Sequence, residues 1–170
     1  MIKIKIEKKL NLENTLTCGQ IFRFYKQDDG SFNVVLDDRV INISETGNYI
    51  YVTSNNEQGL EEKIIRYLDL DTDYENILEE LLNKDKKIKS AVEFSYGLKM
   101  IQQPHFETIM EYIISANNSV PSIANAINNI SKKYGKKVTF RGEEYYLFPS
   151  ISDLKDVTKW PQSKARDMVN

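Results

Sequence analysis

Residues 105–133 read HFETIMEYIISANNSVPSIANAINNISKK. The first half of this stretch repeats apolar residues at the i, i+3, i+4, i+7, i+8 spacing of one helix face. That series is Phe106, Ile109, Met110, Ile113 and Ile114. The spacing breaks at residues 117–119 and resumes after Pro121, a residue suited to the first turn of a helix. The second series is Ile123, Ala126, Ile127 and Ile130. We therefore expect two helices that meet at a polar corner.

Further helices are expected on the N-terminal side of this pair. Asn55-Asn56 would cap a helix from about Glu57, with Leu60, Ile64, Tyr67 and Leu68 on its apolar face. Residues 71–73 would cap a second helix, and a third lies near residues 90–97. On the C-terminal side, residues 138–148 are expected to be extended, and another capped helix would begin after Ser150 or Ser152.

The first 54 residues have the pattern of short antiparallel strands. Ile2, Ile4 and Ile6 alternate with charged residues, which is typical of a half-buried strand. Later aromatic and β-branched bursts are separated by turn residues at 28–30, 37–38 and 46–48. The predicted fold class is α+β: an N-terminal antiparallel sheet with flanking helices over residues 1–97, then an incomplete helical domain over 98–170.

Composition indicates a globular protein of the cytoplasm. Hydrophobic residues make up 41% and charged residues 28%, and the 170 residues include one cysteine. No signal peptide and no apolar run of membrane-spanning length is present, so no membrane partner is expected. The net charge of −2 does not indicate DNA binding, and the lysine runs at 84–89 and 132–137 are interpreted as solvated surface, with a local contact to DNA as the open alternative.

The usual catalytic constellations are absent. One histidine, His105, and one cysteine, Cys18, cannot form a Cys/His zinc site, and no glycine-rich phosphate loop occurs. We expect no metal and no cofactor, and we nominate no catalytic residue. We interpret Cys18 as a small, buried and inert thiol.

Two short segments carry candidate binding residues. In Thr17–Phe24, Gly19 either supplies a turn before a strand or lets a ligand approach the backbone closely. At the corner of the helix pair, Asn117 and Asn118 either cap helices or use their amides to read a nucleobase edge. The residues alone leave both alternatives open.

Four segments together resemble the 8-oxoguanine DNA glycosylase family, in register over about residues 10–155. Leu16–Phe24 is similar to the family's L-x-S-G-Q-x-F-R-W, and Arg66–Asp71 to its K-Y-F-x-L-D. Residues 103–118 resemble D-P-x-E-x-L-x-S-F-I-x-S-x-N-N, and Phe148-Pro149-Ser150 matches F-P-(S/T).

The resemblance implies a fold and a set of contacts. The fold would be a twisted, TBP-like antiparallel sheet followed by a helical domain. Gly19 would offer its carbonyl to the N7 hydrogen that distinguishes 8-oxoguanine from guanine. Asn117, with Asn118 beside it, would contact the orphaned cytosine after the lesion has been flipped out.

Several positions depart from the family pattern. Ser122 aligns with an arginine that often helps to read the cytosine, and Ser163 aligns with the wedge tyrosine of G-Y-R-A. The helix-hairpin-helix L-P-G-V-G and the following V-D, which hold the family's nucleophilic lysine and its activating aspartate, have no match in the chain. We therefore expect the 170 residues to be an N-terminal portion that is inactive alone.

Three functions remain open at this point. The chain would be the recognition part of a glycosylase and AP lyase of base excision repair, with weak affinity of its own for double-stranded DNA that contains oxidised guanine. Alternatively, it would be a non-catalytic DNA-binding protein. The third reading is a structural module that self-associates through exposed sheet edges.

Overall fold

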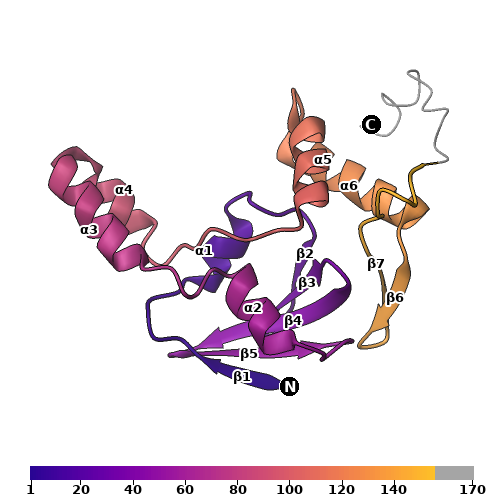
Figure 1. Cartoon of the computed structure of the whole chain (residues 1–170), viewed down its shortest axis with the longest axis horizontal. Coiled ribbons are helices and arrows are strands. Elements are labelled where there is room, and N and C mark those ends of the chain that lie inside the picture. The colour runs from indigo at the N-terminus through magenta and orange to yellow at the C-terminus, as the bar shows by residue number, and fades with distance from the viewer. Residues whose placement is uncertain (156–170) are drawn as a thin grey trace. The chain divides into compact units, whose positions relative to one another are not determined.

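The computed structural model describes residues 1–155, and its elements are labelled in Figure 1. In chain order they are β1 (Ile2–Lys5), α1 (Leu12–Thr17), β2 (Phe24–Lys26), β3 (Phe32–Leu36), β4 (Arg39–Thr46), β5 (Tyr49–Ser54), α2 (Leu60–Tyr67), α3 (Tyr74–Lys84), the 3-10 turn η1 (Lys86–Ile88), α4 (Lys89–Phe94), α5 (His105–Ser115), α6 (Val120–Tyr134), β6 (Lys137–Phe140) and β7 (Glu143–Tyr146). The predicted α+β class is confirmed.

The main sheet has the strand order β1-β5-β4-β3-β2. Strand β1 pairs antiparallel with β5, with Ile4 opposite Ile50, and β2 pairs antiparallel with β3, with Phe24 opposite Val34. The predicted turns at 28–30, 37–38 and 46–48 join successive strands, as expected for a meander. A separate hairpin, β6 and β7, fills the predicted extended stretch.

The chain divides into two compact units, which we describe separately. The first comprises residues 1–21, 43–53 and 57–102, and the second comprises residues 22–42, 54–56 and 103–170.

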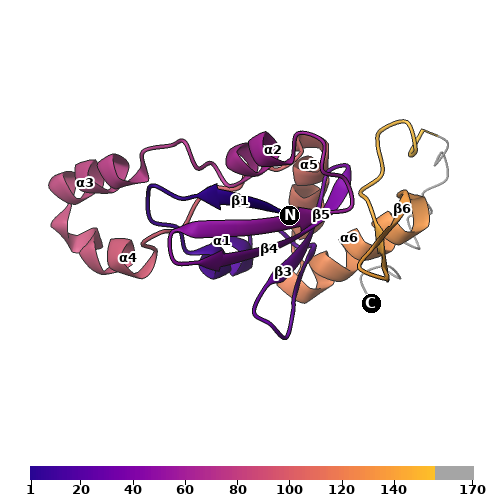
Figure 2. The ribbon, with the colours of Figure 1, turned by 90° about the horizontal axis from the view of Figure 1, so that it is seen from below.

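The core of the first unit forms where the strand alternation meets a helix face. Ile4, Ile50 and Val52 point inward and are fully buried, as are Leu60 and Ile64 on α2. Helix α2 lies along β1 in Figure 2. The predicted start of this helix near Glu57 is wrong, because Gly59 is its N-cap in the left-handed conformation. The Asn55 side chain instead accepts a hydrogen bond from the Val40 amide at 2.8 Å.

Helix α1 is a feature that the strand pattern did not predict. The Asn11 side chain accepts a hydrogen bond from the Asn14 amide at 3.0 Å and so caps the helix. Leu12 and Leu16, four residues apart, are buried on its inner face. This short helix carries the chain from β1 to the Cys18–Gln20 bend.

Helix α3 begins at its predicted cap. Asp73 caps α3 by accepting a hydrogen bond from the Asn76 amide. Helix α4 covers part of the predicted third helix, and α3 and α4 lie side by side in Figures 1 and 2. The lysines at 84, 86, 87 and 89 are exposed, as expected for a solvated surface.

The second unit is built around the β6–β7 hairpin and α6. One buried cluster joins strands β3 and β4 to this hairpin: Val35, Val40, Phe140, Tyr145 and Leu147. Helix α6 starts with Ser119 as its N-cap and Pro121 in the first turn, and its predicted apolar series is buried. Residues 151–155 form hydrogen-bonded turns, and the rest of the helix predicted after Ser150 or Ser152 lies outside the described residues. Across residues 1–155 no helix is long and apolar enough to cross a membrane.

Gly97 lies where two backbones come into contact in the first unit. Its carbonyl accepts a hydrogen bond from the Asn11 amide at 2.7 Å. Its φ is 87°, and an added Cβ would lie 2.9 Å from the Asn11 nitrogen and 3.0 Å from the Leu10 carbonyl carbon. Only glycine fits there without displacing the chain before α1.

We expect Gly97→Ala to destabilise the protein more than Gly30→Ala. Both glycines have similar positive φ, 87° and 80°, but Gly30 has open space where a Cβ would stand. Gly30→Ala therefore measures backbone strain alone, about 1–2 kcal/mol, and Gly97→Ala adds a backbone clash. Urea unfolding of the two variants measures the difference. Equal losses would show that the chain before α1 yields at no cost.

Candidate functional site

Gly19 lies in the first unit, in the bend that follows α1. Its φ is 92°, its backbone is exposed, and nothing stands within 4 Å of where a Cβ would be. Within residues 1–155, its amide and carbonyl have no hydrogen-bond partner. The position combines a conformation that favours glycine with an approachable face, so a planar ligand could contact its carbonyl.

The two neighbours of Gly19 are held in place. The Cys18 amide donates to the Asn14 carbonyl at 3.1 Å and ends α1. The Gln20 side chain donates to the Lys99 carbonyl at 2.8 Å and accepts from the Ile101 amide at 2.9 Å. Gln20 is part of the sequence motif, but local spacing predicts no role for it because its partners lie about 80 residues away.

The interpretation of Cys18 as a buried thiol is wrong. Cys18 is exposed, because it is the C-cap of α1 and faces outward from the helix end. The Gln20 amide nitrogen lies 3.2 Å from its sulfur.

Asn117 and Asn118 lie together in the second unit, between α5 and α6. Asn117 adopts a positive φ of 62°, which asparagine tolerates well. Its side chain is exposed and has no hydrogen-bond partner among residues 1–155. The Asn118 amide, in contrast, donates to the Ile114 carbonyl at 2.7 Å and so caps α5. The corner therefore presents one amide outward and uses the other to hold its shape.

The face that α5 buries differs from the predicted one. Glu107 and Glu111 are 6% and 4% exposed, whereas Ile109 and Ile113 are 56% and 60% exposed. The predicted helix is confirmed, but it is rotated so that two carboxyl groups point inward.

The cause is Arg23, whose side chain is 3% exposed. Its Nε donates to Glu107 at 2.5 Å and its Nη1 donates to the Tyr146 carbonyl at 2.8 Å. The guanidinium also lies 5.7 Å from the centre of the Phe148 ring. A buried guanidinium requires an anion beside it, and Glu107 supplies that anion at the cost of turning the apolar face of α5 outward.

Glu111 lies one helical turn from Glu107 and has no ion-pair partner within the described part of the chain. Burial, and secondarily the charge of Glu107, raises the pKa of Glu111 to about 8, although Arg23 acts in the opposite direction. Glu111 is thus protonated in the folded protein at neutral pH.

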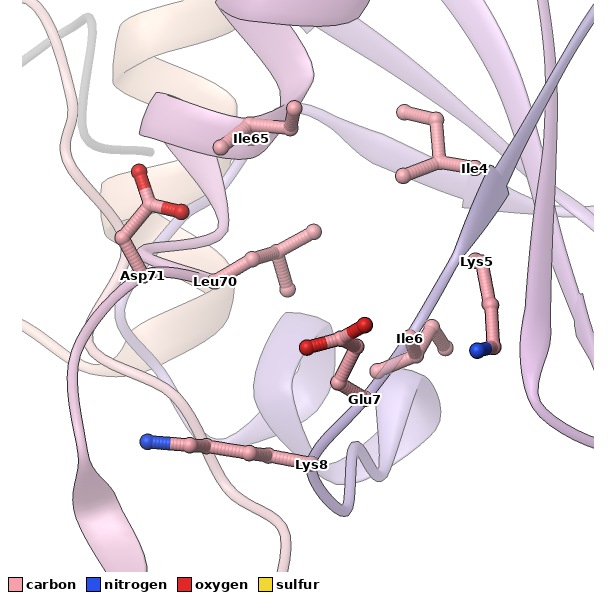
Figure 3. Close-up of a pocket in the computed structure, with 8 residues that line it drawn as sticks. All are labelled: Ile4, Lys5, Ile6, Glu7, Lys8, Ile65, Leu70 and Asp71. Carbon is pink, nitrogen blue, oxygen red and sulfur yellow. The ribbon is translucent and has the colours of Figure 1, made fainter.

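A pocket of about 440 Å³ lies in the first unit, away from the predicted site residues. Figure 3 shows its lining, with apolar side chains beside charged ends of both signs. The lining residues are Ile4, Lys5, Ile6, Glu7, Lys8, Ile65, Leu70 and Asp71. Lys8 is already paired with Asp73 at 3.0 Å. The mixture of charges gives no preference for an anionic ligand.

No group of three or more His, Cys, Asp or Glu side chains that could hold a metal occurs in residues 1–155. Gly19 belongs to the first unit and the asparagine corner to the second. Ser122, which aligns with the family's arginine, takes part in the N-terminal cap of α6. Its hydroxyl lies 2.9 Å from that of Ser119. Ser163 lies outside the described residues.

We expect Glu111→Gln to flatten the dependence of stability on pH. Because the pKa of Glu111 rises from 4.5 when unfolded to about 8 when folded, its contribution to stability is full below about pH 4.5 and is lost as pH rises to about 8. The loss is up to ~1.4 kcal/mol per pH unit. Glutamine has no such titration. Urea unfolding between pH 5 and pH 8 measures both slopes, and identical slopes would contradict the assignment.

Glu107→Gln is the matched control on the same helix face. It removes the anion that pairs with Arg23 and leaves a buried charge uncompensated, so it destabilises the protein by about 3–5 kcal/mol. Glu111→Gln stabilises the protein at pH 8, and the two substitutions therefore have opposite signs there.

The chain is similar to known proteins in both sequence and fold. A sequence model described as the 8-oxoguanine DNA glycosylase N-terminal domain matches residues 2–109, well over half of the chain. A probable N-glycosylase/DNA lyase of Methanothermobacter thermautotrophicus is 34% identical over 59% of this chain and 32% of its own. The N-glycosylase/DNA lyase of Saccharomyces cerevisiae is 23% identical over 98% of this chain and 47% of its own.

Solved structures give the same result. The apo form of Clostridium acetobutylicum 8-oxoguanine glycosylase/lyase matches with a TM-score of 0.84 and 33% identity, over 92% of this chain and 54% of that one. The same enzyme in complex with double-stranded DNA containing cytosine opposite 8-oxoguanine matches with a TM-score of 0.82 and 31% identity, over 93% and 57%. This chain thus spans about half the length of those structures. On the family match, the shared fold and the shared motifs, the chain belongs to the 8-oxoguanine DNA glycosylase family.

Proposed function

We propose that this chain is the damage-recognition part of an 8-oxoguanine DNA glycosylase and AP lyase that acts in base excision repair. The observation that carries the proposal is the open face of Gly19, whose carbonyl has no partner within the described residues. Family membership gives that open carbonyl a ligand of matching chemistry, the base of 8-oxoguanine.

The proposed discrimination follows from one hydrogen atom. In 8-oxoguanine N7 carries a hydrogen and can donate to the Gly19 carbonyl, whereas in guanine N7 is an acceptor and would face that oxygen lone pair to lone pair. Leaving a buried acceptor unsatisfied costs roughly 1–3 kcal/mol, about one to two decades in affinity. Because Gly19 has no Cβ, a planar base can approach its backbone closely.

Asn117 is proposed to contact the cytosine that is left unpaired when the lesion is flipped out. Its exposed amide offers both a donor and an acceptor, which a cytosine edge requires. Asn118 is proposed to belong to the same site, where its bond to the Ile114 carbonyl holds the corner. Ser122 cannot replace a charged arginine in reading the cytosine, so opposite-base selectivity is expected to be relaxed.

The contribution of these 170 residues is proposed to be recognition and not bond cleavage. Attack on the sugar C1′ requires the family's lysine and its activating aspartate, and no stretch of the chain matches the motif that carries them. We retain the division into a sheet domain over residues 1–97 and the start of a helical domain over 98–170 as part of this proposal.

The proposed partner is double-stranded DNA that contains oxidised guanine, bound in the cytoplasm. The Clostridium acetobutylicum relative has been solved with such a duplex. Non-specific affinity comes from phosphate neutralisation, and a chain of net charge −2 is expected to supply little of it. Binding should therefore be weak, and its dependence on salt should be shallow because few phosphates are neutralised.

Borohydride trapping on a labelled duplex with 8-oxoguanine opposite cytosine, run beside a gel shift at low salt, tests this function. A shift without a covalent adduct is the expected result. A trapped adduct would mean that a lysine of this chain is the nucleophile. If a folded sample gives neither a shift nor an adduct, DNA recognition is refuted and the structural module is favoured.

We expect Asn117→Ala to weaken binding to the 8-oxoguanine·cytosine duplex by about 1–3 kcal/mol. Asn129→Ala on α6, where an exposed asparagine is also removed, is the matched control and should leave the affinity unchanged. Fluorescence anisotropy at low salt measures both. An unaltered affinity for the Asn117 variant would show that this residue only shapes the turn.

A further inference from the structure

We propose that Gln20 is the positioning residue of the lesion site: its side-chain amide, by binding segment 97–102, fixes the direction in which the Gly19 carbonyl points. This inference rests on the proposed function of Gly19. It assigns the selectivity of the site to a residue that has no contact of its own with the base.

The Gln20 side-chain amide forms a hydrogen bond at each of its two ends. Its Nε2 donates to the Lys99 carbonyl at 2.8 Å, and its Oε1 accepts from the Ile101 amide at 2.9 Å. The side chain thus bonds to the backbone of two residues of the same segment. Both ends of the amide are used, so the side chain has one orientation.

Segment 97–102 is itself immobilised by hydrogen bonds to other parts of the first unit. On one side the Asn11 amide donates to the Gly97 carbonyl at 2.7 Å, and the Lys99 amide donates to the Thr15 hydroxyl at 3.2 Å. On the other side the Met100 amide donates to the Tyr74 hydroxyl at 2.9 Å. The segment is therefore a fixed support for whatever binds it.

The Lys99 side chain adds a further anchor to this support. It is 1% exposed, and its Nζ lies 4.2 Å from the centre of the Tyr74 ring. Burial, with repulsion from Lys8, lowers the pKa of Lys99. A cation held over an aromatic face in a buried site cannot leave without losing that contact.

Gly19 has no hydrogen bond of its own to residues 1–155. Glycine is the residue with the greatest backbone freedom, yet a hydrogen bond to a base weakens steeply when its angle falls below about 120°. The direction of the carbonyl must then be set by its neighbours. Cys18 is fixed by the end of α1, and Gln20 is fixed by segment 97–102.

The test compares Gln20→Leu with Asn42→Leu in the full 170-residue chain. Gln20→Leu removes both bonds to segment 97–102. Asn42→Leu also removes two side-chain amide hydrogen bonds, to the Ser31 hydroxyl and the Asn33 amide oxygen, but touches no residue of segment 97–102. The readout is the ratio of the dissociation constants for guanine·cytosine and 8-oxoguanine·cytosine duplexes, measured by fluorescence anisotropy at low salt. Urea unfolding reports the stability of each variant.

We expect Gln20→Leu to reduce that ratio on the order of tenfold, whereas Asn42→Leu lowers stability but keeps the ratio. Equal ratios for the two variants would overturn the positioning role while the recognition by Gly19 stands. A wild-type ratio of one would overturn both. The two failures are thus distinguishable.

Gln20→Glu keeps the test decisive if the leucine variant fails to fold. It retains an acceptor for the Ile101 amide but loses the donor to the Lys99 carbonyl. Hydrogen exchange of the Ile101 amide should stay slow in this variant while the duplex ratio falls. A ratio equal to that of the wild type would overturn the proposal.

Discussion

The buried guanidinium of Arg23 is the constraint on which the second unit depends. A charge with 3% exposure must have an anion beside it, and Glu107 on α5 is that anion. The same guanidinium binds the Tyr146 carbonyl at the end of β7, so one side chain joins the approach to β2, α5 and the β6–β7 hairpin. The orientation of α5 follows from this pairing, and with it the outward position of Ile109 and Ile113.

In the first unit, hydrogen bonds between neutral polar groups hold distant parts of the chain together. Segment 97–102 belongs to no helix or strand, so its amides and carbonyls must find other partners. Side chains from α1, from the bend after it and from the start of α3 provide them: Thr15, Gln20 and Tyr74. The bend that carries Gly19 is consequently built against a support made of residues about 80 positions further along the chain.

Both candidate contact points share one design. Gly19 and Asn117 each have positive φ, are exposed and lack a hydrogen-bond partner in the described part of the chain. In each case the side-chain amide of the next residue, Gln20 or Asn118, bonds to a backbone carbonyl of the protein. A group held ready for a ligand has to be free, and its freedom is useful only when its neighbour is fixed.

The sequence by itself determined the α+β class, the meander turns, the cap at Asp73 and the buried face of α6, because these depend on local periodicity and on side chains that bond within a few residues. It also placed Gly19 and Asn117 in their motifs. The tertiary structure alone decided which face α5 buries, since its apolar spacing pointed to Ile109 and Ile113 but a guanidinium from 84 residues away selected Glu107. It likewise decided that Asn55 bonds to β4 instead of capping a helix, that Cys18 is exposed and that Gln20 bonds to the backbone of Lys99 and Ile101. Each of those outcomes depends on a partner distant in sequence, and a pattern of local spacing contains no information about such a partner.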